Sequence, residues 1–363
     1  MLASEDSPKG GSVPREGSTA LHIAIARKDL GFVTWLLDHG VDPNHPDGYG
    51  YTPLEVYFET LPEPGPEEVA LLLIERGGKV NTHGGIVACG VGGRVGLTPL
   101  HLAADRNLLR VARALLAHGA DPNGRGQNDA TPLHWASSAE MIGLLVKAGG
   151  DLEAKGRGGL TPLASAAWLG NSATAVALLE AGAKADPALP EWMAGEGTLY
   201  HRVVSRLGVE NNVAAELSLL KALLKHRADV NRPDEFGQTP LHCACYRSGK
   251  VEEEMALVLL EGGADPKVRD DHGDTPLHKA ADADRPRLVR ELIRKGADVN
   301  SRDGSGCTPL HNACWEFKGD PGVLEALLKA GADIHAKNSD GKEPLDCARD
   351  EHRVKIASIL AGN

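Results

Sequence analysis

Seven of the fifteen histidines recur at one position of a repeated tetrapeptide. Imidazole serves proteins as a general base, as a proton shuttle and as the commonest metal ligand, so these side chains could do chemistry. Recurrence at the same position of seven copies favours a structural role over a catalytic one. The seven residues are His22, His101, His134, His201, His242, His278 and His311.

The run His242-Cys-Ala-Cys245 contains the residue types of a zinc site. Zinc needs about four convergent ligands, commonly with Cys-x2–4-Cys spacing. Cys245 and Cys314 instead fall at one shared position after their tetrapeptides, where other copies have alanine, and Cys243 and Cys347 share the position two residues earlier. We interpret these cysteines as small apolar fillers of a crowded helix and predict no metal.

A glycine-rich run, Gly90–Gly96, is the closest approach to a phosphate-binding loop. It lacks the third glycine of the dinucleotide pattern, because Val95 stands there, and no Gly-Lys-Ser/Thr follows. The sequence also has no Gly-x-Ser-x-Gly nucleophile elbow. We therefore predict no catalytic residue and no cofactor, and expect that the chain is not an enzyme.

Composition narrows the partners and the compartment. The formal charge is −11, whereas a nucleic-acid-binding protein presents a basic face. No stretch approaches the ~20 apolar residues of a membrane span. Residues 1–16 have no signal-peptide core and are rich in Ser, Pro, Gly and charge, which predicts a disordered tail. The spacing of the six cysteines shows no disulfide framework, which indicates an intracellular, cytoplasmic protein that could also enter the nucleus.

The tetrapeptide Thr-Pro-Leu-His marks an internal repeat. Intact copies begin at Thr98, Thr131, Thr239, Thr275 and Thr308, and degraded copies begin at residues 19, 52, 161, 198 and 343. The first and last copies are 324 residues apart, so nine intervals average 36 residues. Leucine pairs and a turn similar to Gly-Ala-Asp follow most copies, as at Leu115-Leu116 and Gly119-Ala-Asp121.

This pattern predicts two helices in each repeat. Thr is a helix N-cap, and Pro at the first helical position lacks only an N–H that would be unpaired anyway. Alanine recurs five residues after the first motif residue, where a small side chain lets neighbouring helices approach closely. The second helix has apolar residues at helical spacing, and the following glycine favours the left-handed conformation that ends a helix. Trp35 falls in such an apolar stripe and is predicted to lie in the core.

From Gly17 to the C-terminus the sequence resembles the ankyrin-repeat family, whose signature is Thr-Pro-Leu-His and whose period is about 33 residues. The resemblance implies an all-α solenoid of about ten repeats, with short β-hairpin fingers, spanning residues 17–363. It also implies that the motif histidine ties the tight turns together by hydrogen bonds. The expected function is a scaffold, adaptor or inhibitory subunit that binds another protein.

In the family that this sequence resembles, partners lie on the concave face, which the finger tips and the exposed ends of the first helices form. The matching positions are seven and eight residues after the first motif residue. Trp, Tyr and Arg dominate binding hot spots. We therefore predict contacts with a neutral or basic protein segment, and expect a monomer. The predicted partner-binding residues are Tyr49, Tyr51, Arg106, Trp168, Phe236, Tyr246, Arg247, Trp315 and Glu316.

The places where the repeat is broken suggest an alternative. Insertions at 82–96 and 187–197 interrupt the period, and the second contains Trp192. The second insertion also marks a possible hinge. An enzyme or enzyme subunit could place a small-molecule site in the groove under either insertion. The fourth repeat is three residues short, which we attribute to a lost loop between its helices.

Overall fold

The computed structural model describes residues 17–59, 66–83, 96–187, 189–190, 197–205, 213–246 and 250–362. Throughout these ranges the regular elements are helical, and no strand occurs among them. Each of the ten tetrapeptide positions begins a helix or a short 3-10 helix, which confirms the predicted all-α repeat architecture. The tail 1–16 and most of the insertions at 82–96 and 187–197 lie outside the described residues.

A repeat consists of a first helix, a second helix and a finger that leads to the next repeat. The last repeat has η4 (Pro344–Cys347) and α19 (Asp350–Ala361), and the 3-10 helices η1 (Gln127–Asp129) and η2 (Arg157–Gly159) lie in fingers. The first helices are α1 (Ala20–Ala26), α3 (Pro53–Glu59), α5 (Pro99–Asp105), α7 (Pro132–Trp135), α9 (Pro162–Leu169), α11 (Leu199–Ser205), α13 (Pro240–Tyr246), α15 (Pro276–Asp282) and α17 (Pro309–Trp315). The second helices are α2 (Leu30–Asp38), α4 (Glu67–Glu75), α6 (Leu109–Ala117), α8 (Ala139–Lys147), α10 (Ser172–Glu180), α12 (Val213–Lys225), α14 (Lys250–Glu261), α16 (Pro286–Arg294) and α18 (Gly322–Lys329).

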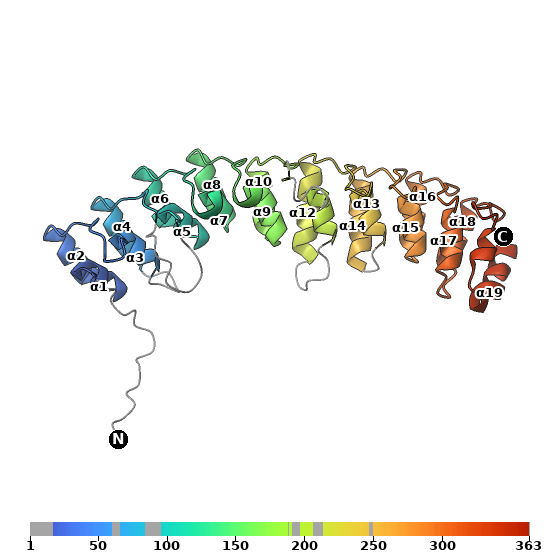
Figure 1. Cartoon of the computed structure of the whole chain (residues 1–363), viewed down its shortest axis with the longest axis horizontal. Helices are drawn as coiled ribbons and strands as arrows, with labels where there is room; N and C mark the ends of the chain where they lie inside the picture. Colours follow the sequence, from blue (N-terminus) through green and yellow to red (C-terminus); the bar gives the residue numbers. More distant parts are fainter. Residues whose placement is uncertain are drawn as a thin grey trace, which may run out of the picture. The chain divides into compact units, whose positions relative to one another are not determined.

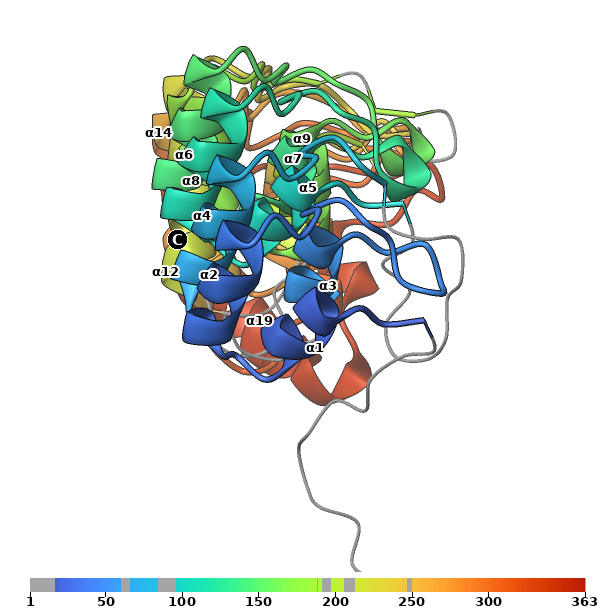
Figure 2. The same cartoon turned by 90° about the vertical axis from the view of Figure 1, so that its left-hand side faces the viewer.

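The chain forms two compact units, one comprising Met1–Ala166 with Ala177–Lys184 and the other Ala167–Val176 with Ala185–Asn363. In the first unit α1, α3, α5 and α7 pack in sequence order, and α2, α4, α6 and α8 pack in a second layer (Figures 1 and 2). In the second unit α11, α13, α15 and α17 form one layer and α12, α14, α16 and α18 the other.

The core lies between these layers. Leu100 of α5 and Leu115 of α6 are fully buried, as are their equivalents Leu310 and Leu327 in α17 and α18. Burying one such side chain stabilises the fold by roughly 1.5–3 kcal/mol. A lone helix pair leaves one face of these leucines in water, so stability arises from stacking repeat on repeat.

The fingers are tight turns rather than the predicted β-hairpins. In the finger before α13, the Asp234 carboxylate accepts hydrogen bonds of 2.9 Å from the N–H groups of Phe236 and Gln238, and one backbone pair joins Asp234 to Gln238. The aspartate side chain thus accepts hydrogen bonds that backbone groups of the partner strand would accept in a β-hairpin. Gly237 has a φ of +71°, and a Cβ there would lie 2.9 Å from the amide nitrogen of Asp271 in the next finger, so glycine lets the fingers stack.

The fourth repeat is shortened within its first helix, not in the loop between helices. Helix α7 has four residues, whereas α5 has seven, and Ala136 is already extended. Ser138, which the sequence places on the exposed end of the first helix, is instead the N-cap of α8, where its hydroxyl accepts from the Met141 N–H.

Trp35 is not in the core, so that prediction is wrong. Its side chain is 53% exposed and stacks on His39, with ring centroids 4.0 Å apart. Helix α2 is apolar on two sides: Val33, Leu36 and Leu37 are buried, whereas Phe32 and Trp35 are exposed. The residues at the position of Phe32 in α6 and α16, Val111 and Leu288, are buried, but no described repeat precedes α2.

Candidate functional site

The motif histidines are structural, as the sequence predicts. In the third repeat the backbone N–H of Thr98 donates to Nδ1 of His101 at 3.2 Å, and Nε2 lies 2.9 Å from the carbonyl oxygen of Ala130 in the next finger. The same pair of ring contacts recurs at His22, His134, His201, His242, His278 and His311. Nδ1 therefore caps its own helix and Nε2 joins it to the next repeat, which leaves neither nitrogen for a substrate or a metal.

The degraded second copy keeps the contact within the motif, to the threonine, with a different residue. Glu55 stands where seven of the ten copies have histidine, and its Oε2 accepts from the backbone N–H of Thr52 at 2.7 Å and from its hydroxyl at 2.9 Å. A carboxylate can thus cap this helix as the imidazole does, which explains why the motif tolerates the replacement.

One His/Asp/Cys group has the geometry of a metal site within the described ranges. Ligand atoms of His201, Asp234 and Cys243 lie within 4.8 Å of one another. The imidazole and the carboxylate are already engaged in the finger contacts that other repeats make without cysteine. In the next repeat Lys279 takes the position of Cys243, so the imidazole and carboxylate of this group are held by the repeat framework whether or not a thiol stands beside them.

The two groups of cysteines differ in burial, which the sequence does not indicate. Cys245 and Cys314 are fully buried fillers, as predicted, and burial raises the pKa of the Cys314 thiol to about 12. Cys243 and Cys347 are only half-buried, so they fill their helices less completely than the other two cysteines do. They occupy the side of the first helix that faces its own finger.

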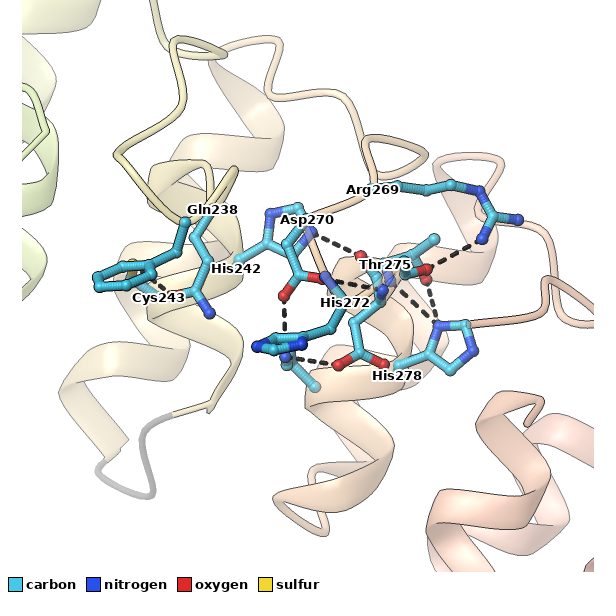
Figure 3. A network of polar contacts seen from close by, with 12 residues as sticks. Gln238, His242, Cys243, Arg269, Asp270, His272, Thr275 and His278 are labelled. Atoms are coloured by element: carbon cyan, nitrogen blue, oxygen red, sulfur yellow. Dashed lines mark hydrogen bonds and ion pairs between the residues drawn. The ribbon is translucent and has the colours of Figure 1, made fainter. Parts of the chain in front are cut away.

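At the position of Cys243, Lys279 forms the best-buried ion-pair cluster of the second unit's fingers. Its Nζ lies 3.0 Å from the Asp270 carboxylate and 2.6 Å from the Asp274 carboxylate. Figure 3 shows Asp270 between His242 and the start of α15. Burial would raise the pKa of Asp270, but the hydrogen bond and charge of Lys279 outweigh it and hold that pKa below its usual value. This cluster fixes the finger to α15.

The exposed aromatic residues of the second unit lie at finger tips and helix ends. Tyr246 is the last residue of α13 and is 63% exposed, and Trp315 is the last residue of α17 and is 56% exposed. Phe236 is at a finger tip and is also more than half exposed. Glu316, beside Trp315, lies 3.4 Å from the Arg349 guanidinium. These four predicted residues are accessible to a partner.

The other predicted residues are placed differently. Tyr49 is exposed at a finger tip of the first unit. Tyr51 is buried, and its backbone binds Asp47 and His22, so it offers no surface. Arg106 is half-buried at the end of α5, and Arg247 lies outside the described residues.

Trp168 is half-buried under a cation that the sequence reasoning missed. The Arg202 guanidinium lies 4.6 Å from the indole centroid, and its Nη2 donates to the Trp168 carbonyl oxygen at 2.6 Å. Trp168 therefore packs against the neighbouring repeat, whereas Tyr246 and Trp315 are more than half exposed. Arg202 and Lys279 are each four residues after the first residue of their motifs. A basic residue at this shared position is the sequence signal that could have revealed the contact with Trp168.

An open depression of about 230 Å³ lies between α14 and α16, on the second-helix layer. Its lining includes Leu257, Leu260, Arg287 and Glu291. Arg287 is paired with Glu254 at 2.7 Å. The depression is thus a seam between charged helices, with no convergent acid and base. In the described part of the chain, no helix is long and apolar enough to cross a membrane.

Comparison with known proteins agrees with the repeat pattern. The sequence matches the family described as "Ankyrin repeats (3 copies)" over residues 100–188 and 249–338. It matches families described as "Ankyrin repeats (many copies)" over 9–56 and 213–252.

Curated relatives carry similar segments within other proteins. The chain is 34% identical over 159 residues to mouse B-cell lymphoma 3 protein homolog, covering 42% of this chain and 33% of that protein. It is 32% identical over 194 residues to human Rabankyrin-5, covering 51% and 16%. It is 34% identical over 181 residues to human Ankyrin repeat and SOCS box protein 16, covering 47% and 37%. The matched segments span well under half of each relative. The chain belongs to the ankyrin-repeat family, whose repeats are protein–protein interaction modules.

Proposed function

We propose that this chain is a non-catalytic scaffold, adaptor or inhibitory subunit that holds an extended segment of another protein. The binding surface is the predicted concave face, which consists of the finger tips and the C-terminal ends of the first helices. We call it the first-helix face. Its proposed contact residues are Tyr49, Phe236, Tyr246, Arg247, Trp315 and Glu316, with Trp168 and Arg106 at its margin.

The observation that supports the proposal most strongly is the exposure of Tyr246 and Trp315. Large aromatic side chains left in water are unfavourable for a protein that works alone, and they supply most of the binding free energy where partners meet. Their helices pack through the opposite side, where Ala244 and Ala313 are buried. The fold therefore does not need either ring to be aromatic.

A non-catalytic role is supported by how the titratable groups are used. The motif histidines have both nitrogens occupied, and burial raises the pKa of the Cys245 and Cys314 thiols, so neither thiol is a ready nucleophile. We further propose a cytoplasmic monomer whose partner is neutral or basic and is not a nucleic acid, in keeping with the charge of −11.

The test is affinity capture with the full chain as bait, followed by binding measurements with each purified captured protein. Three baits are compared: the natural sequence, Tyr246→Ala with Trp315→Ala, and Phe32→Ala with Trp35→Ala as a matched exposed pair on α2. Hot-spot truncations cost at least about 2 kcal/mol together, so we expect at least a tenfold loss of affinity in the first variant alone.

Two outcomes oppose the proposal. A captured protein that binds the Tyr246/Trp315 variant as tightly as the natural chain places binding on another face. If only the Phe32/Trp35 variant loses binding, the binding site lies on the second-helix layer instead. Circular dichroism of each variant shows that the folds are equivalent.

A further inference from the structure

Three side chains form a row across three successive repeats of the second unit. Tyr246, Asp282 and Trp315 are the last residues of α13, α15 and α17, each seven residues after the first motif residue. Because α15 packs against both α13 and α17, the three residues lie on one side of the layer, with Asp282 in the middle. Packed helices are about 10 Å apart, so neighbouring members of this row, the 246–282–315 row, are separated by roughly that distance.

The carboxylate in the middle of the row has no partner. Asp282 is half-buried, and within the described part of the chain it forms no hydrogen bond or ion pair. The nearby Lys279 forms ion pairs with Asp270 and Asp274, and Arg349 forms an ion pair with Glu316.

The surroundings of Asp282 make its negative charge unfavourable in the free protein. Burial is the largest cause of its raised pKa, followed by the carboxylates of Glu316 on α17 and Asp274 in the finger, and Lys279 and Lys318 oppose them only in part. Helix C-termini add partial negative charge at the same place. Among the described residues, the row thus has an incompletely compensated negative centre between two exposed rings.

Extending the proposed function, on which this inference rests, we propose that the row recognises a Lys or Arg side chain of the partner segment. The basic group pairs with Asp282, and apolar side chains on either side of it contact Tyr246 and Trp315. A segment in the polyproline II conformation has three residues per turn and advances about 3.1 Å per residue, so every third side chain lies on one side, about 10 Å from the last. The recognised pattern is therefore apolar, two residues, basic, two residues, apolar.

Charge complementarity selects this occupant over a second copy of the chain. Another copy brings a net charge of −11 to a site that is already negative. A basic segment instead offsets the repulsion between Asp282 and its neighbouring carboxylates. The aliphatic stem of its Lys or Arg also covers apolar surface. Arg has an additional advantage, because its flat guanidinium also stacks on aromatic faces.

The test is selection of random peptides of about 12 residues, long enough at about 40 Å to cover three to four repeats. The full chain is the bait, and peptides are retained only if Tyr246→Ala with Trp315→Ala abolishes their binding. We expect these peptides to share one basic residue with apolar residues three positions before and after it. Asp282→Asn should weaken them at least about tenfold, and the matched variant Asp284→Asn by less than about threefold.

A double-mutant cycle then tests the pairing itself. Replacing the peptide's basic residue by Gln should give the same loss as Asp282→Asn, and the two changes together should give no further loss. Retained peptides without a fixed basic position overturn this inference and leave the proposed function standing. Absence of any peptide that depends on Tyr246 and Trp315 overturns both. Binding that Asp282→Asn and Asp284→Asn weaken equally reduces the row to general electrostatics and also overturns the inference.

Discussion

At the scale of single residues, the motif histidines make stability depend on pH. Burial lowers the pKa of His134, His201, His242, His278 and His311 and brings that of His101 to about 4. The unfolded chain binds protons near pH 6.5, before the folded chain does. Stability is therefore complete above that pH and is lost as the pH falls towards the folded values.

We expect the melting temperature to fall steadily between about pH 6.5 and 5, a range in which ordinary Asp and Glu side chains keep their charge. Thermal unfolding followed by circular dichroism at steps of about half a pH unit measures it. Replacing His101 by Asn removes one titrating ring and should make the fall shallower. A melting temperature that stays level down to pH 5 would contradict the assigned role of the rings.

The expected effect of Asp282 on stability is opposite to that of a structural carboxylate. Its pKa is raised in the folded protein, so its charge destabilises the fold above that pKa, and the effect vanishes below the unfolded value near 3.9. Asp282→Asn should raise the melting temperature at pH 7, with the gain disappearing near pH 3.5. Higher stability together with weaker peptide binding is the signature of a residue kept for recognition. If the variant melts earlier at pH 7, Asp282 is structural.

At the scale of elements, the attachment of a finger to its helix depends on Lys279. Lys279→Met leaves the buried Asp270 carboxylate and Asp274 without their cation, which costs several kcal/mol in buried pairs. We expect a loss of about 2–4 kcal/mol in urea unfolding. Lys295→Met, on an exposed helix end, is the control and should change stability by less than about 0.5 kcal/mol. Equal effects of the two variants would show that the cluster contributes little.

The helix starts could be predicted because they depend on residues three apart in sequence. Thr275 caps α15 and His278 returns the contact, as the motif implies. The bridging role of asparagine after the Gly-Ala-Asp turn was not predicted, since it depends on a partner in the next repeat. Asn300, for example, donates to the Gly331 carbonyl oxygen and accepts from the Asp333 N–H.

Side-chain exposure was harder to predict, because one helical stripe has different neighbours in different repeats. Trp35 and Ala114 occupy equivalent positions of α2 and α6, yet the first is exposed and the second half-buried. Trp168 and Trp315 occupy equivalent positions of α9 and α17, but Arg202 covers only the first. The repeat position of the candidate site could therefore be predicted from the sequence. Which residues at that position are accessible depends on the side chains of the next repeat.

At the scale of the whole molecule, the strongest contacts between described elements lie within a repeat or between adjacent repeats. In such an array stability is nearly a sum of repeat and interface contributions, and damage stays close to where it is made. Because the proposed contacts Tyr246 and Trp315 lie in the second unit, binding should survive damage to the first unit but not to the repeats that carry the row.

Two core leucines test this locality in the full chain. Leu115 in α6 and Leu310 in α17 are both fully buried, and replacing either by alanine costs about 2–5 kcal/mol. By hydrogen exchange, Leu115→Ala should accelerate the amides of α5 to α8 and leave those of α15 and α17 within about twofold. Peptides that depend on Tyr246 and Trp315 should bind this variant normally. Leu310→Ala should reverse the pattern, accelerating α15 to α18 and weakening the peptides. If each variant accelerates exchange equally everywhere, the chain unfolds as one cooperative body and the repeats are not energetically local.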